Sequence, residues 1–282
     1  MTRETERQLF VSSRGWSDAA AERLAGDASA RSYLRLSDRV LGSAVLMDAP
    51  PETGEDIRPF SRIARHLSGI GLSAPEILAE DPEKGFLLLE DFGDALFARL
   101  VEKDPSREIA LYEAAVDTLT ELHRHTPPAG LPKLGPSEMS AAVDVAVNWY
   151  AAGCGKPAPG GAANELGRIL RPHLDRLSRA EPVLALRDFH AENLLWLPER
   201  EGVRRVGLLD FQDAFAGHPA YDLISLLEDA RRDVSEASRQ AALARFSRSG
   251  NHDPDALSYA CAIFGAQRNL RILGVFARLC MH

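Results

Sequence analysis

Short apolar runs separated by turn residues dominate the first ninety residues. A polar turn around residues 26–30 lies between an expected strand near 23–25 and a returning strand with Tyr33 and Leu34. The Pro50-Pro51 pair ends the next apolar run, because proline cannot continue a strand ladder. Between the later runs, apolar positions recur at helical spacing and stop at Gly69. The pattern therefore predicts strands at 23–25, 33–34, 44–47, 74–78 and 86–89 and helices at 4–15 and 58–69.

Longer amphipathic stretches take over after about residue 92. Ala115, Leu119 and Leu122 share one stripe of an expected helix that the Pro127-Pro128 pair ends. Three short apolar segments at 183–186, 194–197 and 206–209 interrupt the helical pattern. Helices are expected at 106–126, 138–151, 161–179, 219–232, 236–247 and 254–280. A strand-rich front and a helix-rich back predict an α+β protein with two lobes, residues 1–91 and 92–282, and a cleft between them.

Composition narrows the class of protein. The chain has 282 residues, with 45% hydrophobic and 26% charged residues, which is the balance of an ordinary globular protein. Its formal charge of −8 argues against a nucleic-acid partner, which needs a basic face. Three cysteines without metal-ligand spacing, together with a charged start that lacks an apolar run, predict a cytoplasmic protein that is not bound to a membrane.

Two polar loops next to short strands carry the candidate chemistry. Asp188 and Asn193 lie in the segment RDFHAEN, and Asp210 follows the strand expected at 206–209. If the two strands pair as a hairpin, Asn193 and Asp210 come to the same end. One amide oxygen and one carboxylate suit Mg²⁺, which keeps water and phosphate oxygens as its other ligands. Asp188 would then orient a hydroxyl nucleophile beside the metal, the arrangement that phosphoryl transfer needs.

The pattern D-x-H-x-x-N, followed by L-L-D-F-x-D-A, resembles the catalytic and metal loops of the aminoglycoside phosphotransferase/choline kinase family. This resemblance implies a protein-kinase-like fold, ATP and Mg²⁺ as cofactors, Asp188 as catalytic base, and Asn193 and Asp210 as metal ligands. Arg187, His190 and Asp222 would be supporting residues. The segments LAGDASARSYLRL, VLMDAPPE and GFLLLEDFG are similar to the branch that phosphorylates the anomeric hydroxyl of N-acetylmuramate and N-acetylglucosamine in cell-wall recycling.

The expected nucleotide site lies in the front lobe. A phosphate-covering turn would contain Gly26, Asp27, Ala28 and Ser29, while Leu89, Glu90 and Phe92 would bind adenine. The family pattern has a lysine on the third strand, where this chain has Met47 and Asp48. We expect Arg31 or Arg35 to replace the lysine, because both lie close in sequence to the phosphate-covering turn. As alternate residues of one strand, they would also share the same strand face.

The acceptor is less constrained than the chemistry. Asp213, His218 and Trp149 are candidate substrate contacts, although an aromatic residue such as Trp149 is more often part of the packing. An aminoglycoside, choline or homoserine is an alternative acceptor. The missing lysine also motivates a different class of function, a nucleotide-binding pseudokinase, although the intact Asp188, Asn193 and Asp210 argue against it.

Overall fold

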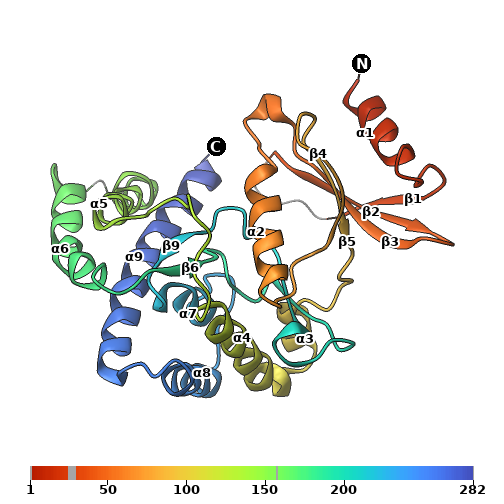
Figure 1. Cartoon of the computed structure of the whole chain (residues 1–282). Helices are drawn as coiled ribbons and strands as arrows, with labels where there is room; N and C mark the ends of the chain where they lie inside the picture. The colour runs from red at the N-terminus through yellow and green to blue at the C-terminus, as the bar shows by residue number, and fades with distance from the viewer. Residues whose placement is uncertain (1, 25–29, 157, 282) are drawn as a thin grey trace. The chain divides into compact units, whose positions relative to one another are not determined.

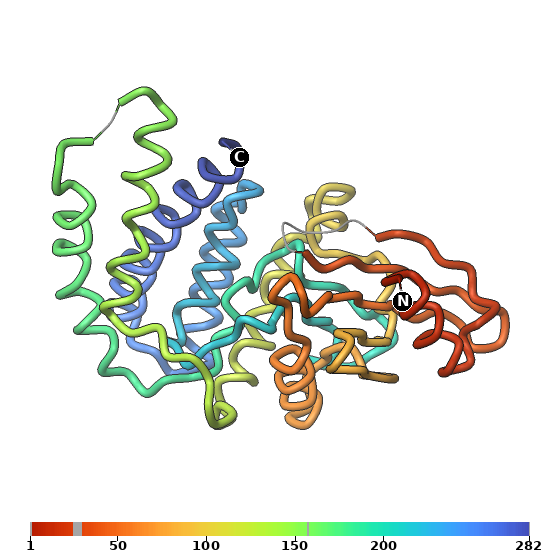
Figure 2. Tube along the Cα trace, turned by 90° about the horizontal axis from the view of Figure 1, so that it is seen from above, coloured from red at the N-terminus to blue at the C-terminus, as the bar shows by residue number. Residues whose placement is uncertain are grey.

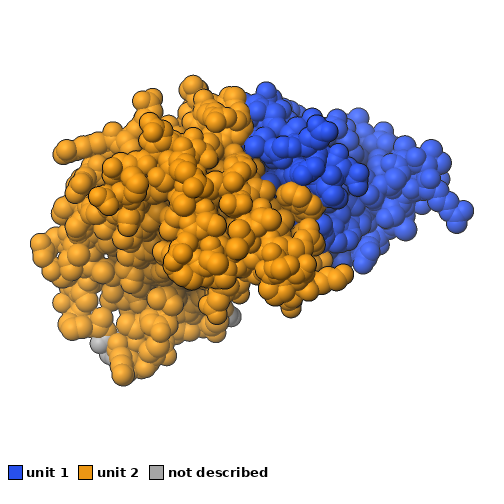
Figure 3. All heavy atoms as spheres, turned by 90° about the horizontal axis from the view of Figure 1, so that it is seen from below, with its two compact units in different colours: residues 1–95, 197–213 blue, residues 96–196, 214–282 orange. Residues whose placement is uncertain are grey.

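The computed structural model describes residues 2–24, 30–156 and 158–281, and the chain forms two compact units. Unit 1 comprises residues 1–95 and 197–213, and unit 2 comprises residues 96–196 and 214–282 (Figure 3). The division into lobes 1–91 and 92–282 stays a prediction, because a compact unit is defined by contacts and not by function. The compact units differ from it chiefly because the segment 197–213 belongs with the first unit.

Unit 1 is built on a five-stranded antiparallel sheet with the strand order β1-β2-β3-β5-β4 (Figure 1). Helix α2 is tied to β4 by a 2.9 Å hydrogen bond from Ser61 Oγ to Glu80. The elements of this unit are α1 (Arg3–Ser12), β1 (Ala20–Arg23), β2 (Ser32–Asp38), β3 (Gly42–Asp48), α2 (Arg58–Gly69), β4 (Ile77–Asp81), β5 (Phe86–Glu90) and β8 (Val206–Leu208). The strands and the two helices predicted for the front of the chain are confirmed, with shifts of a few residues at their ends.

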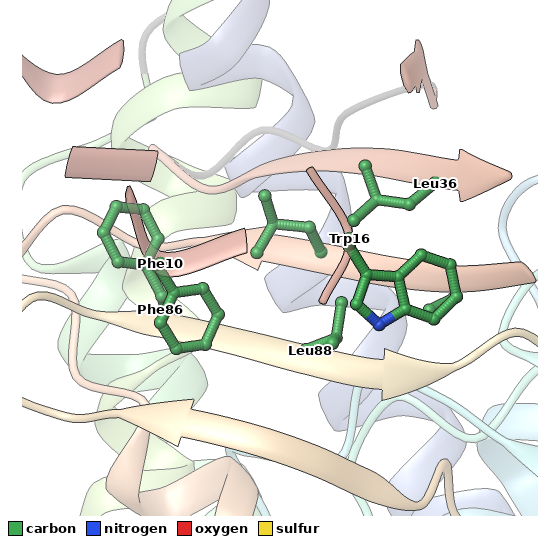
Figure 4. Packing of buried hydrophobic residues seen from close by; sticks show 7 residues of the cluster. Phe10, Trp16, Leu36, Phe86 and Leu88 are labelled. Carbon is green, nitrogen blue, oxygen red and sulfur yellow. The ribbon is translucent and has the colours of Figure 1, made fainter. Parts of the chain in front are cut away.

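The core of unit 1 lies between α1 and one face of the sheet. Phe10 of α1 stacks on Phe86 of β5 with 5.4 Å between ring centroids, and Trp16 and Leu88 extend the same cluster (Figure 4). Alternation along β5 turns Leu87 and Leu89 to the opposite face. Both faces of the strand are therefore buried, which explains the continuous apolar run FLLL in the sequence.

Unit 2 is mostly helical. Its long helix α9 runs alongside α7 and a π-helix, Ala146–Ala151 (Figures 1 and 2). Strands β6 and β9 form an antiparallel pair in which Val183 lies opposite Gly217. The other elements are α3 (Phe97–Lys103), α4 (Glu108–Leu122), α5 (Pro136–Ala141), α6 (Ala162–Leu177), β6 (Val183–Ala185), β7 (Leu194–Trp196), β9 (Phe215–Gly217), α7 (Ala220–Leu227), α8 (Glu236–Ser249) and α9 (Pro254–Met281).

Unit 2 differs from the expected elements in three respects. The helix expected at 138–151 is two segments, α5 and the π-helix. Helix α7 ends at Leu227 rather than near 232, because Asp229 accepts a hydrogen bond from the Arg231 N–H in a local turn. Helix α3 and strand β9 were not predicted, since both are too short for a clear periodic signal.

Candidate active site

The loop that carries Asp188 is held from beneath by a buried carboxylate. Asp222 of α7 accepts hydrogen bonds from the backbone N–H groups of Leu186, at 2.6 Å, and Arg187, at 2.9 Å. Burial raises the pKa of Asp222 to about 7, and the two N–H donors oppose this shift by stabilising the ionised form. The contact shows how Asp222 can have the supporting role that the resemblance implied.

Arg187 has an uncommon backbone conformation. Its φ of 76° is in the left-handed region, which non-glycine residues seldom adopt. The Arg187 carbonyl accepts a 3.0 Å hydrogen bond from Arg268 Nη1 of α9, and Arg268 Nη2 donates to Ser225 at 2.7 Å. The strained residue is thus held at its N–H by Asp222 and at its carbonyl by Arg268.

The other end of the loop is closed by Asn193. Its side-chain amide donates to the Asp188 carbonyl at 2.9 Å, and its backbone N–H donates to the His190 carbonyl at 2.8 Å. Because the amide nitrogen is the donor to Asp188, the amide oxygen is the atom with which Asn193 can bind a metal ion. Asp188 itself is half-buried.

His190 is a buried neutral imidazole. Burial, followed by the nearby charge of Arg231, lowers its pKa to about 4. Arg231 Nη1 lies 3.2 Å from His190 Nε2, and an arginine can only donate, so Nε2 accepts and the ring proton is on Nδ1. His190 therefore packs beneath the loop, in agreement with a supporting role.

Asp188 opens into a cavity of about 130 Å³. Sequence reasoning missed every other residue of its lining, which consists of Arg231, Arg268, Arg271, Ile272, Val275 and Phe276. The five lining residues that belong to α9 have the spacing of one helix face, i, i+3, i+4, i+7 and i+8. Two arginines within such an apolar stripe are the signal that could have revealed them.

In unit 1, Asp210 shares the left-handed conformation seen at Arg187, with a φ of 56°. Its Oδ1 accepts a 2.8 Å hydrogen bond from Gln212. The next residue, Phe211, is fully buried and stacks on Phe60 of α2 with 4.7 Å between ring centroids. Among the described residues, three non-glycine positions have positive φ, and two of them are Arg187 and Asp210 on the predicted catalytic and metal loops.

The two arginines proposed to replace the missing lysine have different surroundings. Arg31 lies 3.2 Å from Glu55 and 3.9 Å from Asp210 Oδ1. Arg35 instead donates to Asp94 at 3.0 Å and forms a 2.8 Å ion pair with Asp91. Arg31 is therefore the arginine next to the predicted metal ligand.

The remaining nucleotide candidates belong to the end of β5 and the loop after it. Glu90 pairs with Arg200, whose guanidinium lies 4.9 Å from the centroid of the Phe92 ring. Asp48, at the position where the family pattern led us to look for a lysine, is buried and accepts a 2.9 Å hydrogen bond from Arg3 of α1. The predicted phosphate-covering residues Gly26, Asp27, Ala28 and Ser29 lie outside the described residues.

The three predicted substrate contacts do not line the Asp188 cavity. His218 lines a different cavity of about 250 Å³, and burial lowers its pKa to about 4. Trp149 is half-buried in the π-helix, and Asp213 is exposed in unit 1. Their role in substrate binding stays a prediction.

The chain is similar to known phosphotransferases over most of its length. Residues 20–258 match the model of a family described as the phosphotransferase enzyme family. The N-acetylmuramate/N-acetylglucosamine kinase of Caulobacter vibrioides is 38% identical over 98% of this chain and 86% of its own length. The enzyme of the same name from Pseudomonas aeruginosa is 34% identical over 97% of this chain and 81% of its own length.

Solved structures extend the likeness to the fold. Choline kinase LicA from Streptococcus pneumoniae superposes with a TM-score of 0.69 at 14% identity, covering 99% of this chain and 91% of that one. Aminoglycoside phosphotransferase APH(3'')-Id from Streptomyces rimosus superposes with a TM-score of 0.62 at 20% identity, covering 93% and 98%. The predicted α+β, protein-kinase-like fold is confirmed. In the described part of the chain, no helix is both long enough and apolar enough to span a bilayer.

Proposed function

The chain belongs to the phosphotransferase enzyme family, and from that premise we propose that it transfers the γ-phosphate of ATP to the anomeric hydroxyl of N-acetylmuramate or N-acetylglucosamine. It is a small-molecule kinase, as its relatives across nearly the whole chain indicate. The observation that carries the proposal is the Asp188 loop, which is braced at both ends and lets Asp188 line a cavity.

Asp188 acts as the base in this proposal. Its carboxylate accepts a hydrogen bond from the acceptor hydroxyl and takes the proton as the new oxygen–phosphorus bond forms. The bond between the γ-phosphorus and the β–γ bridging oxygen breaks, and ADP leaves. Alignment is the main requirement of such a transfer, and the contacts of Asp222, Arg268 and Asn193 supply it by fixing the backbone on both sides of Asp188.

We assign the nucleotide to unit 1. Backbone groups near Glu90 would bind adenine, with Leu89 and Phe92 as apolar contacts. Arg31 is the better phosphate ligand, because one of its two carboxylate neighbours is the predicted metal ligand Asp210, whereas Arg35 pairs with Asp91 and Asp94, which are not predicted metal ligands. The ion pair with Glu55 holds the Arg31 guanidinium 3.9 Å from Asp210. A phosphate group bound to a metal ion at Asp210 would then lie within reach of that guanidinium.

Asn193 and Asp210 are the proposed protein ligands of Mg²⁺, through one amide oxygen and one carboxylate. Within the described residues, no three His, Cys, Asp or Glu side chains gather as a metal site. Mg²⁺ commonly takes one or two protein ligands and completes its shell with water and phosphate oxygens. When bound, Mg²⁺ neutralises the charge that develops on the leaving oxygen.

The turn between the segments that carry Asn193 and Asp210 supports this metal assignment. In unit 1, Leu197 N–H donates to the Arg205 carbonyl at 2.8 Å, which closes the connection between the segments that carry Asn193 and Asp210. A closed connection sends the chain back in the opposite direction, as the predicted hairpin requires.

The acceptor is assigned from the names of the relatives and from the charge near Asp188. Choline and aminoglycosides are cations, and the Asp188 cavity presents three arginines, so cationic acceptors are disfavoured there. A neutral or acidic sugar meets no such repulsion. This favours an amino sugar over choline or an aminoglycoside.

The test is direct phosphorylation of each sugar with Mg·ATP, with the anomeric phosphate identified by phosphorus NMR. The Asp188→Asn variant should lose about 10²- to 10⁴-fold in kcat while ATP binding is kept. Asp175→Asn is the matched control, since Asp175 is an exposed carboxylate of the same unit that pairs with Arg171. Normal turnover by Asp188→Asn, or no phosphorylation of either sugar by the wild type, would refute the proposal.

A further inference from the structure

The cavity beside Asp188 combines positive charge with an apolar wall. Arg231, Arg268 and Arg271 line it together with Ile272, Val275 and Phe276. Its volume of about 130 Å³ is below the roughly 300 Å³ at which small-molecule pockets begin. This small volume favours one substituent of the acceptor over a whole sugar ring.

The three arginines are not equivalent. Arg268 is buried and already donates to the Arg187 carbonyl and to Ser225, so it braces the loop. Arg231 is about half exposed and lies 3.2 Å from His190 and 3.6 Å from Asp229. Arg271 is half-buried, and across the described residues it has no hydrogen bond and no ion pair within 4 Å.

A half-buried guanidinium that has no ion pair within 4 Å has lost part of its hydration, and the charge of Asp188 acts on it only at longer range. Burial is also the main cause that lowers the pKa of Arg271. An anionic ligand group would restore the lost interaction, because a guanidinium binds a carboxylate through two parallel hydrogen bonds. The cavity therefore fits a small carboxylate that also carries an apolar group.

We propose that Arg271 is the specificity-determining residue for an acidic acceptor and binds the lactyl carboxylate of N-acetylmuramate. The lactyl methyl group then lies against Ile272, Val275 and Phe276, and Arg231 adds positive charge at the cavity mouth. This inference rests on the proposed function. C1 and C3 of the sugar are separated by one ring carbon, so a single ring presents its hydroxyl to Asp188 and its C3 substituent to the arginines.

The two sugars give the inference an internal control, since N-acetylglucosamine lacks the lactyl group. In Arg271→Met, which keeps an apolar stem but removes the guanidinium, kcat/KM for N-acetylmuramate should fall roughly 10- to 150-fold, the loss of one charge-assisted interaction. The kcat/KM for N-acetylglucosamine should change less than about threefold, because the variant leaves Asp188 and its braces intact. Arg278→Met, an exposed arginine of the same helix, is the matched control and should change neither value.

A neutral analogue completes the experiment. The wild type should use the lactyl amide of N-acetylmuramate as poorly as Arg271→Met uses the acid, and Arg271→Met should no longer distinguish acid from amide. Equal losses for both sugars would overturn the inference, because they would indicate that Arg271 binds the transferred phosphate. Unchanged use of N-acetylmuramate would overturn it as well. If the wild type phosphorylates neither sugar, both the proposed function and the inference about Arg271 fail. If the wild type phosphorylates N-acetylglucosamine but Arg271→Met leaves the use of N-acetylmuramate unchanged, only the inference about Arg271 fails.

Discussion

Replacing Asp222 with asparagine isolates the contact that fixes the catalytic loop. The carboxylate accepts two backbone N–H groups with its two oxygens, at 2.6 and 2.9 Å. Asparagine can accept one of them and must turn its own N–H₂ group toward the other. Burial raises the pKa of Asp222 to about 7, so the wild-type side chain is ionised near pH 8, where the comparison belongs.

The expected loss of stability follows from these two bonds. One charge-assisted hydrogen bond becomes neutral, and one buried N–H loses its partner, a loss of about 2–4 kcal/mol that relief of the buried charge partly offsets. At roughly 2–4 °C for each kcal/mol, Tm should fall by up to about 15 °C. Arg187, with its φ of 76°, also loses the contact that holds its strained backbone, so the loop should shift.

The loop shift predicts a second, kinetic signature. A displacement of Asp188 by about 1 Å should lower kcat by about 10²-fold, whereas KM for ATP should stay within about threefold. Thermal unfolding and a coupled assay of ADP release measure both effects. Asp117→Asn is the matched control, since it removes a charge from a partly exposed pair with Arg245 and should cost less than about 1 kcal/mol. Wild-type kcat with a Tm within 2 °C of the wild type would refute the reasoning about the brace.

Three further outcomes are expected. Gly274→Ala would put a Cβ 2.2 Å from the carbonyl carbon of Val145, so thermal unfolding should show a loss of about 1–3 kcal/mol, whereas Gly69→Ala at an open helix position should show none. Burial lowers the pKa of His123 to about 3, so below pH 6.5 the unfolded chain binds a proton that the folded chain does not. The free energy of unfolding should therefore fall by up to about 1.4 kcal/mol per pH unit between pH 6.5 and 3. Urea unfolding of His123→Leu at several pH values should show a smaller decrease over this range. Arg31→Met should raise KM for ATP about tenfold or more, whereas Arg35→Met should mainly lower Tm; the reverse result would assign the phosphate to Arg35.

Local patterns of the sequence determined most elements and the candidate chemistry. Helix α2 follows from the spacing of Phe60, Ile63 and Leu67, because a half-buried helix needs one apolar stripe. The segments RDFHAEN and LLDF pointed to Asp188, Asn193 and Asp210, because the chemistry requires these side chains at short, fixed separations in the chain.

Contacts between distant residues were decided by the tertiary structure alone. Asp222 accepts from the backbone at residues 186 and 187, and Arg271, more than eighty positions after Asp188 in the chain, lines the Asp188 cavity from α9. The same is true of the π-helix, which packs against α9 where Gly274 leaves no room for a Cβ beside Val145. A sequence pattern records which face of a helix is buried, but the partner of that face depends on how the whole chain packs, so the arginines around Asp188 became visible only in the folded protein.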